Sequence, residues 1–133
     1  MARGFSLFEM VIVMGIIGLI LGGAIYTMGG IKNTAAIKTA QSDMGSFKTS
    51  LDSYELLAGN YPSTEQGLEA LYKRPTGSPR PKQWTQIVTS EDALLDPWKT
   101  KYKYELGDNR VPVITSAGPD REFGGEDDIS TED

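Results

Sequence analysis

The chain opens with MARGFSLFEMVIVMGIIGLI (residues 1–20), an apolar run that begins at Phe5 and contains one carboxylate, Glu9. No charged residue occurs from Met10 to Met28. Because a helix rises about 1.5 Å per residue, this run is long enough to cross the roughly 30 Å hydrocarbon core of a bilayer. An acidic residue in such a segment costs insertion free energy and usually marks a function. These residues therefore predict a membrane helix with a functional carboxylate near its start.

The alternative to a retained membrane helix is a cleaved secretory signal peptide. Signal peptides carry apolar regions of roughly 7–15 residues that end in a small-x-small cleavage site. The run found here is longer and continues into a further helical pattern. Arg3, on its N-terminal side, favours a cytoplasmic location for that end. We therefore expect a single-pass transmembrane helix over residues 5–30.

An amphipathic pattern extends the predicted helix beyond Gly30. Its apolar residues recur at spacings of three and four, the period of one helix face, and they are Ala40, Met44, Phe47, Leu51, Tyr54 and Ala58. Gly59 and Asn60 form a C-terminal stop, with Pro62 just beyond them. The sequence predicts one helix from about Phe5 to Ala58, whose second half packs on a small C-terminal domain.

Residues 61–81 contain two local signals. Ser63 and Gln66 have the spacing of a capping box, which predicts a short helix through Tyr72. Three prolines within residues 75–81 forbid regular structure and predict a loop.

Two alternating stretches predict a β-hairpin. They are residues 101–106 and 111–115, joined by a turn at residues 107–110. Pro112 favours an edge or bulged position for the second strand, since proline lacks the N–H that a central strand donates. The fold class that follows is α+β, with a short antiparallel sheet laid on the long helix.

The composition excludes several classes of function. The chain has no cysteine and no histidine, which removes disulfides, thiolate chemistry, Ser-His-Asp triads and most zinc sites. A formal net charge of −5 argues against a nucleic-acid partner. We expect a protein that is not an enzyme.

The C-terminal stretch is rich in carboxylates. From Asp120 to the end of the sequence there is one basic residue, Arg121, and there are seven acidic residues. The acidic residues are Asp120, Glu122, Glu126, Asp127, Asp128, Glu132 and Asp133. Hard oxygen ligands on a glycine-broken loop suit Ca²⁺, although the spacing of an EF-hand is absent. The alternative is a solvated acidic tail.

Arg3-Gly4-Phe5-Ser6-Leu7-Phe8-Glu9 resembles the processing site of type IV pilins and type II secretion pseudopilins. The resemblance implies a leader peptide of residues 1–4, cleavage between Gly4 and Phe5 by a prepilin peptidase, and N-methylation of Phe5. It also gives Glu9 a role in assembly. Cleavage leaves an α-amine on Phe5, whose pKa is ordinarily near 8, and Glu9 of an incoming subunit neutralises that amine on a neighbour.

Three further segments resemble the major pseudopilins of type II secretion systems. They are residues 61–71 (YPSTEQGLEAL), residues 96–98 (DPW) and residues 116–129. The resemblance implies a calcium-binding loop in a periplasmic domain of residues 31–133. Its ligands would be the side chains of Asp120, Asp127 and Asp128 and the carbonyl of Ala117. Lys99 and Arg121 depart from the family pattern.

The function that this resemblance implies is that of a structural subunit. The chain is expected in the inner membrane, with its N-terminus in the cytoplasm and its C-terminal domain in the periplasm. It would polymerise with itself and with minor pseudopilins into a periplasmic pseudopilus, on an inner-membrane assembly platform with an ATPase, and support export of folded proteins. The alternatives are a type IV pilin, a minor pseudopilin, or a membrane-anchored calcium-dependent enzyme or glycan-binding module.

Overall fold

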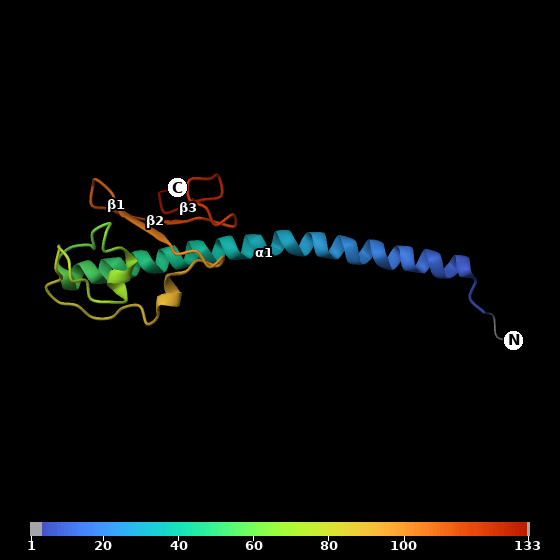
Figure 1. Ribbon diagram of the computed structural model, residues 1–133, viewed down its shortest axis with the longest axis horizontal. Helices are drawn as coiled ribbons and strands as arrows, with labels where there is room; N and C mark the ends of the chain where they lie inside the picture. Colours follow the sequence, from blue (N-terminus) through green and yellow to red (C-terminus); the bar gives the residue numbers. More distant parts are fainter. Residues whose placement is uncertain (1–3, 133) are drawn as a thin grey trace. The chain divides into compact units, whose positions relative to one another are not determined.

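A computed structural model describes residues 4–132, apart from the side chains of residues 24–32 (Figure 1). Residues 1–3 of the predicted leader, including Arg3, and the C-terminal Asp133 lie outside the described residues. The chain divides into two compact units, Met1–Ala35 and Ala36–Asp133.

The first element, α1, is an α-helix over Leu7–Ala58, which confirms the predicted long helix. Its described side chains from Leu7 to Gly23 are exposed, and most of them are apolar. Among the residues whose side chains are described, no helical stretch combines the length and apolarity required of a membrane span.

In the second unit, the predicted apolar stripe of α1 forms the centre of the core. All six stripe residues are buried, and Ala40, Leu51 and Ala58 have no exposed surface. All of the stripe residues except Ala40 belong to one cluster with residues from the rest of this unit, which are Leu68, Leu71, Leu94, Tyr102, Tyr104 and Ile114. Burying a large apolar side chain contributes about 1.5–3 kcal/mol, so this one stripe organises the unit around the helix.

The end of α1 follows from Gly59. This residue has φ +87°, in the left-handed region that glycine adopts at little cost, and its N–H donates to the Glu55 carbonyl at 2.7 Å. The predicted stop is therefore confirmed.

Three antiparallel strands form the sheet, in the order β1-β2-β3: Lys103–Leu106, Pro112–Ser116 and Ile129–Ser130. In Figure 1 the sheet lies on one side of α1, and the loop that leads to η2 (Glu91–Leu94) lies on the other. The predicted hairpin is confirmed, whereas the two-residue β3 and the 3-10 helix η2 had no clear sequence signal.

The edge or bulged position expected for the second strand is wrong, because β2 is the central strand. Pro112 is its first residue and lies opposite Leu106 at one end of the β1–β2 ladder. The third strand pairs only with Thr115 and Ser116, at the other end of β2. Proline has no N–H to donate, and at position 112 none is needed by β3, because β3 pairs only with the other end of β2.

The two hydrogen bonds of the predicted capping box form, but the box does not cap the helix that follows, which is a 3-10 helix. The Gln66 N–H donates to Ser63 Oγ at 3.2 Å, and the Ser63 N–H donates to Gln66 Oε1 at 3.1 Å. The helix that follows, η1, spans Leu68–Leu71 and begins after Gly67, whose φ is +60°. The left-handed conformation of Gly67 separates the capping box from the helix.

Candidate functional site

The predicted processing site lies in exposed, non-helical backbone. Gly4, Phe5 and Ser6 precede α1, and Phe5 is 77% exposed. A Cβ atom added to Gly4 would meet no atom within 4 Å. The fold of the subunit therefore does not itself require glycine at this position, and the bond between Gly4 and Phe5 is open to approach.

Glu9 lies in the first turn of α1, and its side chain is exposed. The helix begins around it, since the Met10 N–H donates to the Ser6 carbonyl at 3.2 Å. A negative charge near a helix N-terminus interacts favourably with the helix dipole. The structure thus places Glu9 four residues after Phe5, in the first turn of α1, with its side chain exposed.

Glycines on the same part of α1 face open space. A Cβ atom added to Gly15, Gly18 or Gly22 would meet nothing within 4 Å. No contact within the described subunit requires these glycines, although each lowers the intrinsic stability of a helix by about 1 kcal/mol relative to alanine. Glycines at a four-residue spacing allow close approach of another helix.

Residues 117–128 form the loop between β2 and β3, here called the acidic loop. Its start is buried, since Ala117 has no exposed surface. Gly118 has φ +71°, and a Cβ atom there would collide with the backbone carbonyl of Asp127. Glycine is therefore required by a close backbone contact that brings the two ends of the acidic loop together.

The three predicted acidic ligands lie in this loop with different surroundings. Asp128 Oδ2 accepts the Gly124 N–H at 2.8 Å, whereas the buried Asp128 Oδ1 has no hydrogen-bond partner among the described residues. Asp120 Oδ1 accepts the Glu122 N–H at 3.0 Å. Asp127 is exposed. In the described part of the chain, no three acidic side chains converge into a group that could hold a metal by themselves.

The unpartnered oxygen of Asp128 is the feature that fits a cation. Buried polar atoms nearly always have a partner, and a carboxylate oxygen without one is destabilising. Calcium takes six to eight oxygens, including backbone carbonyls and water, in irregular geometry. The donor set of the acidic loop therefore suits a hard cation, with Asp128 as the central residue.

Sequence reasoning missed the importance of Asp96. This carboxylate is 2% exposed, and its Oδ1 accepts the N–H groups of Trp98 at 3.0 Å and Thr100 at 2.8 Å. Its Oδ2 accepts the Ser116 hydroxyl at 2.7 Å, and Ser116 Oγ accepts the Gly118 N–H at 3.2 Å. The Asp-Pro-Trp turn thus holds the start of the acidic loop. An Asp-Pro pair was the available signal, but it did not reveal this partner.

Lys99 lies at a strained position of the backbone. Its φ is +70°, a conformation that glycine adopts more readily than lysine. The turn is retained, since the Lys99 N–H donates to the Asp96 carbonyl at 2.9 Å. Arg121 likewise has a positive φ, +64°, and is exposed.

Comparisons with known proteins identify the family of this chain. A model of the family described as Type II secretion system (T2SS), protein G matches residues 27–132. Relatives in Pseudomonas aeruginosa and Escherichia coli strain K12, both named type II secretion system core protein G, are 35% identical over 125 residues and 36% identical over 129 residues. These alignments cover 93% and 96% of this chain and 88% and 89% of the relatives.

A solved structure is similar as well. It is the crystal structure of the major pseudopilin from the type 2 secretion system of enterohaemorrhagic Escherichia coli, with a TM-score of 0.67 and 36% identity. The match covers 77% of this chain and 90% of that chain. With the family match over residues 27–132, it shows that this chain belongs to the protein G family of type II secretion systems, the family of the major pseudopilins.

Proposed function

We propose that this chain is a structural subunit that polymerises into the periplasmic pseudopilus of a type II secretion system and supports export of folded proteins. The observation that carries this proposal is the family match over residues 27–132, together with the similarity to a solved major pseudopilin. The subunit performs no catalytic step. Because of the role of its family, we also assign it two kinds of partner: minor pseudopilins, and an inner-membrane assembly platform with an ATPase.

The exposed apolar surface of α1 supports assembly through this helix. Leu7 and Phe8 in its first turn are 86% and 73% exposed, and Phe5, just before the helix, is 77% exposed. Leaving such side chains in water is unfavourable by about 25 cal/mol per Å² of apolar surface, so this surface requires lipid or neighbouring helices. We place residues 5–30 first in the inner membrane, with the N-terminus cytoplasmic and the second unit periplasmic, and then in the filament.

Processing prepares the N-terminus for this assembly. A prepilin peptidase cuts between Gly4 and Phe5 and methylates the new N-terminal Phe5, which keeps a protonated amine. In an apolar filament interior, that amine and Glu9 of a neighbouring subunit would each be costly alone. Leaving one member of a desolvated charge pair without its partner typically costs about 3–5 kcal/mol. The pairing therefore selects the correct axial offset between subunits.

We also assign one Ca²⁺ ion to the acidic loop. Asp128 supplies its partnerless Oδ1, and Asp120, Asp127 and the Ala117 carbonyl complete the protein's share of the ligands. A bound ion supplies positive charge that offsets the repulsion among the carboxylates. The Gly118–Asp127 contact and the Asp96–Ser116 hydrogen bond hold the two ends of the loop in place for it.

Genetic complementation tests the proposed function. A host lacking its own copy of this protein should regain export of folded proteins into the medium when the chain is supplied. The same cells should contain a mature chain that begins at a methylated Phe5, detected as the intact mass of membrane-extracted protein. Retention of Met1, or no recovery of export when the chain is supplied, would contradict the proposal. An unrelated single-pass membrane protein expressed at the same level is the control.

A further inference from the structure

We infer that a basic pocket on the second unit binds the acidic loop of a second copy of this chain. The basic pocket is a cavity of about 380 Å³ lined by Arg74, Pro75, Thr76, Arg80 and Pro81. Its occupant is the segment 122–126 (EFGGE) of the neighbouring subunit. This inference rests on the proposed function, since it names a contact between subunits of the filament.

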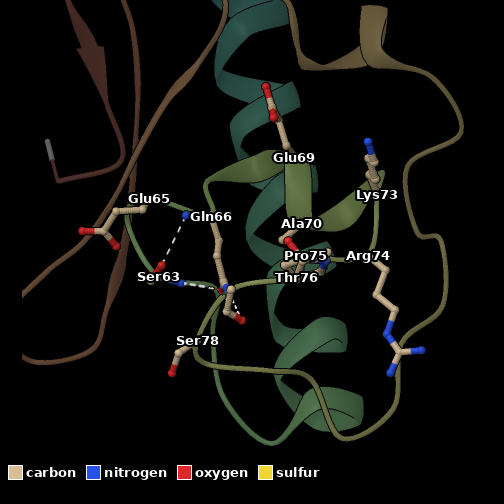
Figure 2. A pocket seen from close by; sticks show the side chains of 11 residues that line it. Ser63, Glu65, Gln66, Glu69, Ala70, Lys73, Arg74, Pro75, Thr76 and Ser78 are labelled. Atoms are coloured by element: carbon tan, nitrogen blue, oxygen red, sulfur yellow. Dashed lines mark hydrogen bonds between the residues drawn. The ribbon is translucent and has the colours of Figure 1, made fainter.

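The loop that builds the basic pocket is held by interactions with the rest of the domain. The Gln66 side-chain amide donates from Nε2 to the Gly77 carbonyl at 3.1 Å and to the Pro79 carbonyl at 2.9 Å. The other end of this amide accepts the Ser63 N–H, as drawn in Figure 2. Pro81 is buried. The basic pocket therefore exists before any ligand arrives, which lowers the entropy cost of binding.

The charge of the basic pocket is unbalanced. Within residues 4–132, neither Arg74 nor Arg80 forms an ion pair, and both side chains are exposed. Arg74 also lines an adjoining cavity of about 420 Å³, whose lining includes Glu65 and Glu69 as well as Lys73, whereas the lining of the basic pocket itself contains no acid. Figure 2 shows the Arg74 guanidinium extending away from Gln66. Planar guanidinium groups bind carboxylates in bidentate pairs, so two arginines about one cavity favour a ligand with two carboxylates.

The segment 122–126 offers a matching arrangement. Glu122 and Glu126 are exposed and flank Phe123, which is 43% exposed although it is aromatic. The Glu122 N–H donates to Asp120 Oδ1, which fixes the start of the segment. Its two acids can meet the two arginines while the ring packs on Pro75, the half-buried proline of the basic pocket. A simple anion such as phosphate would use the charges and leave the apolar part of the pocket uncovered.

The proposed contact is compatible with calcium in the same loop. The residues assigned to the ion are Ala117, Asp120, Asp127 and Asp128, so the two glutamates remain available to a neighbour. The basic pocket and the segment are different surfaces of one chain. A contact between two different surfaces is heterologous, and when its rotation does not close it repeats into an open helical filament. The contact thus has the symmetry that a filament requires.

Charge exchange in the full-length chain, expressed with its assembly system, tests the contact. Arg74→Glu/Arg80→Glu and Glu122→Arg/Glu126→Arg should each lower the yield of sheared filaments by at least about tenfold, because like charges then face each other. Combining all four substitutions should restore the yield. The matched control is Lys99→Glu/Arg110→Glu, which makes the same change in net charge at two exposed cations outside the pocket and should assemble normally.

Disulfide trapping gives a second measurement that does not depend on charge. The chain has no cysteine, so Thr76→Cys/Phe123→Cys should form ladders of cross-linked subunits under copper–phenanthroline oxidation. Thr76→Cys/Val111→Cys is the control and should not, although Val111 is 53% exposed.

The results that would contradict the proposed contact differ from the result that would contradict the proposed function. Normal filaments from both charge-reversal variants, or no restoration in the fourfold variant, would overturn the contact and leave the pocket to another anionic partner. Absence of cross-links between positions 76 and 123 of assembled subunits would do the same. If the unmodified chain forms no filaments at all, it is the proposed function that fails.

Discussion

Asp96 Oδ2 accepts a 2.7 Å hydrogen bond from Ser116 Oγ, across twenty positions of sequence, and this bond joins the Asp-Pro-Trp turn to the start of the acidic loop. Both residues are buried, with exposures of 2% and 0%. Ser116 Oγ also accepts the Gly118 N–H, so one hydroxyl connects the carboxylate to the loop backbone. The position of the acidic loop therefore depends on a residue that lies outside it.

Ser116→Ala should lower the free energy of unfolding of the domain. The substitution removes the donor to Asp96 and leaves a buried carboxylate oxygen without it, which costs about 1–3 kcal/mol. Urea unfolding of residues 36–133 measures the change. Ser53→Ala is the control, because the Ser53 hydroxyl is exposed and bonds only to the Thr49 carbonyl within α1. If Ser53→Ala lowers the free energy of unfolding as much as Ser116→Ala does, the hydrogen bond between Ser116 and Asp96 has no special role in stability.

Calcium should raise the thermal stability of the same domain. An ion bound only to the folded state contributes RT ln(1 + [L]/Kd), about 2.7 kcal/mol at a hundredfold excess over Kd. Asp127→Ala and Asp128→Asn should reduce this gain, whereas Glu132→Gln, outside the assigned ligand set, should keep it. The measurement is the melting midpoint with calcium and with chelator.

The helix should remain formed in both calcium variants, since its apolar stripe is buried independently of the acidic loop. Far-UV circular dichroism checks this point. If chelator leaves the melting midpoint of the wild-type domain unchanged, the acidic loop binds no calcium and is only a solvated acidic stretch.

Because of three tyrosines, we expect the free energy of unfolding of the domain to fall at alkaline pH. Burial raises the pKa of Tyr54, Tyr102 and Tyr104 above the ordinary value near 10, and Asp43, 3.1 Å from the Tyr102 hydroxyl, raises the pKa of Tyr102 further. Above about pH 10 the unfolded chain loses phenol protons that the folded chain keeps, so the free energy of unfolding falls as pH rises. Below about pH 10 the contribution of these tyrosines to the free energy of unfolding is fully present.

The size of this effect is measurable by urea unfolding at a series of pH values. Each tyrosine contributes a slope of up to about 1.4 kcal/mol per pH unit. Tyr102→Phe should make the decline above pH 10 shallower by about one such contribution. A decline as steep as that of the wild type would show that Tyr102 ionises equally in both states.

Lys99→Gly should stabilise the domain by up to about 1 kcal/mol. The φ of +70° strains a lysine by roughly 1–2 kcal/mol, and the larger entropy of unfolded glycine offsets part of the relief. Chemical denaturation of the single variant measures the gain. Lys99→Ala retains a Cβ atom and should show no gain, so equal stabilisation by alanine would contradict this cause.

Glu9→Ala should leave membrane insertion intact and block filament formation. Insertion should be at least as efficient, because a group that is costly in the bilayer is removed. Assembly should fail because the Phe5 amine of the neighbouring subunit loses its counter-charge. Membrane fractionation and shearing of filaments measure the two steps separately. Normal filament yield from this variant would rule out the pairing, and Ser6→Ala is the neighbouring control.

Local pattern was enough to predict the long helix and the face that it buries. The stripe from Ala40 to Ala58 repeats every three to four residues, and this period belongs to the helix whatever packs against it. Gly59 ends the helix through its own backbone freedom, and the residues around Gly4 and Glu9 carry the family resemblance without reference to the fold.

Contacts between distant residues were decided only by the tertiary structure. A two-residue strand such as β3 has no periodicity to detect, and its pairing with one end of β2 is what makes Pro112 compatible with a central strand. The partner of Asp96 lies twenty residues away, so no local pattern could reveal it. Sequence determined what each segment prefers by itself, whereas packing determined which buried polar groups meet, because a buried donor or acceptor must find its partner wherever the chain brings one.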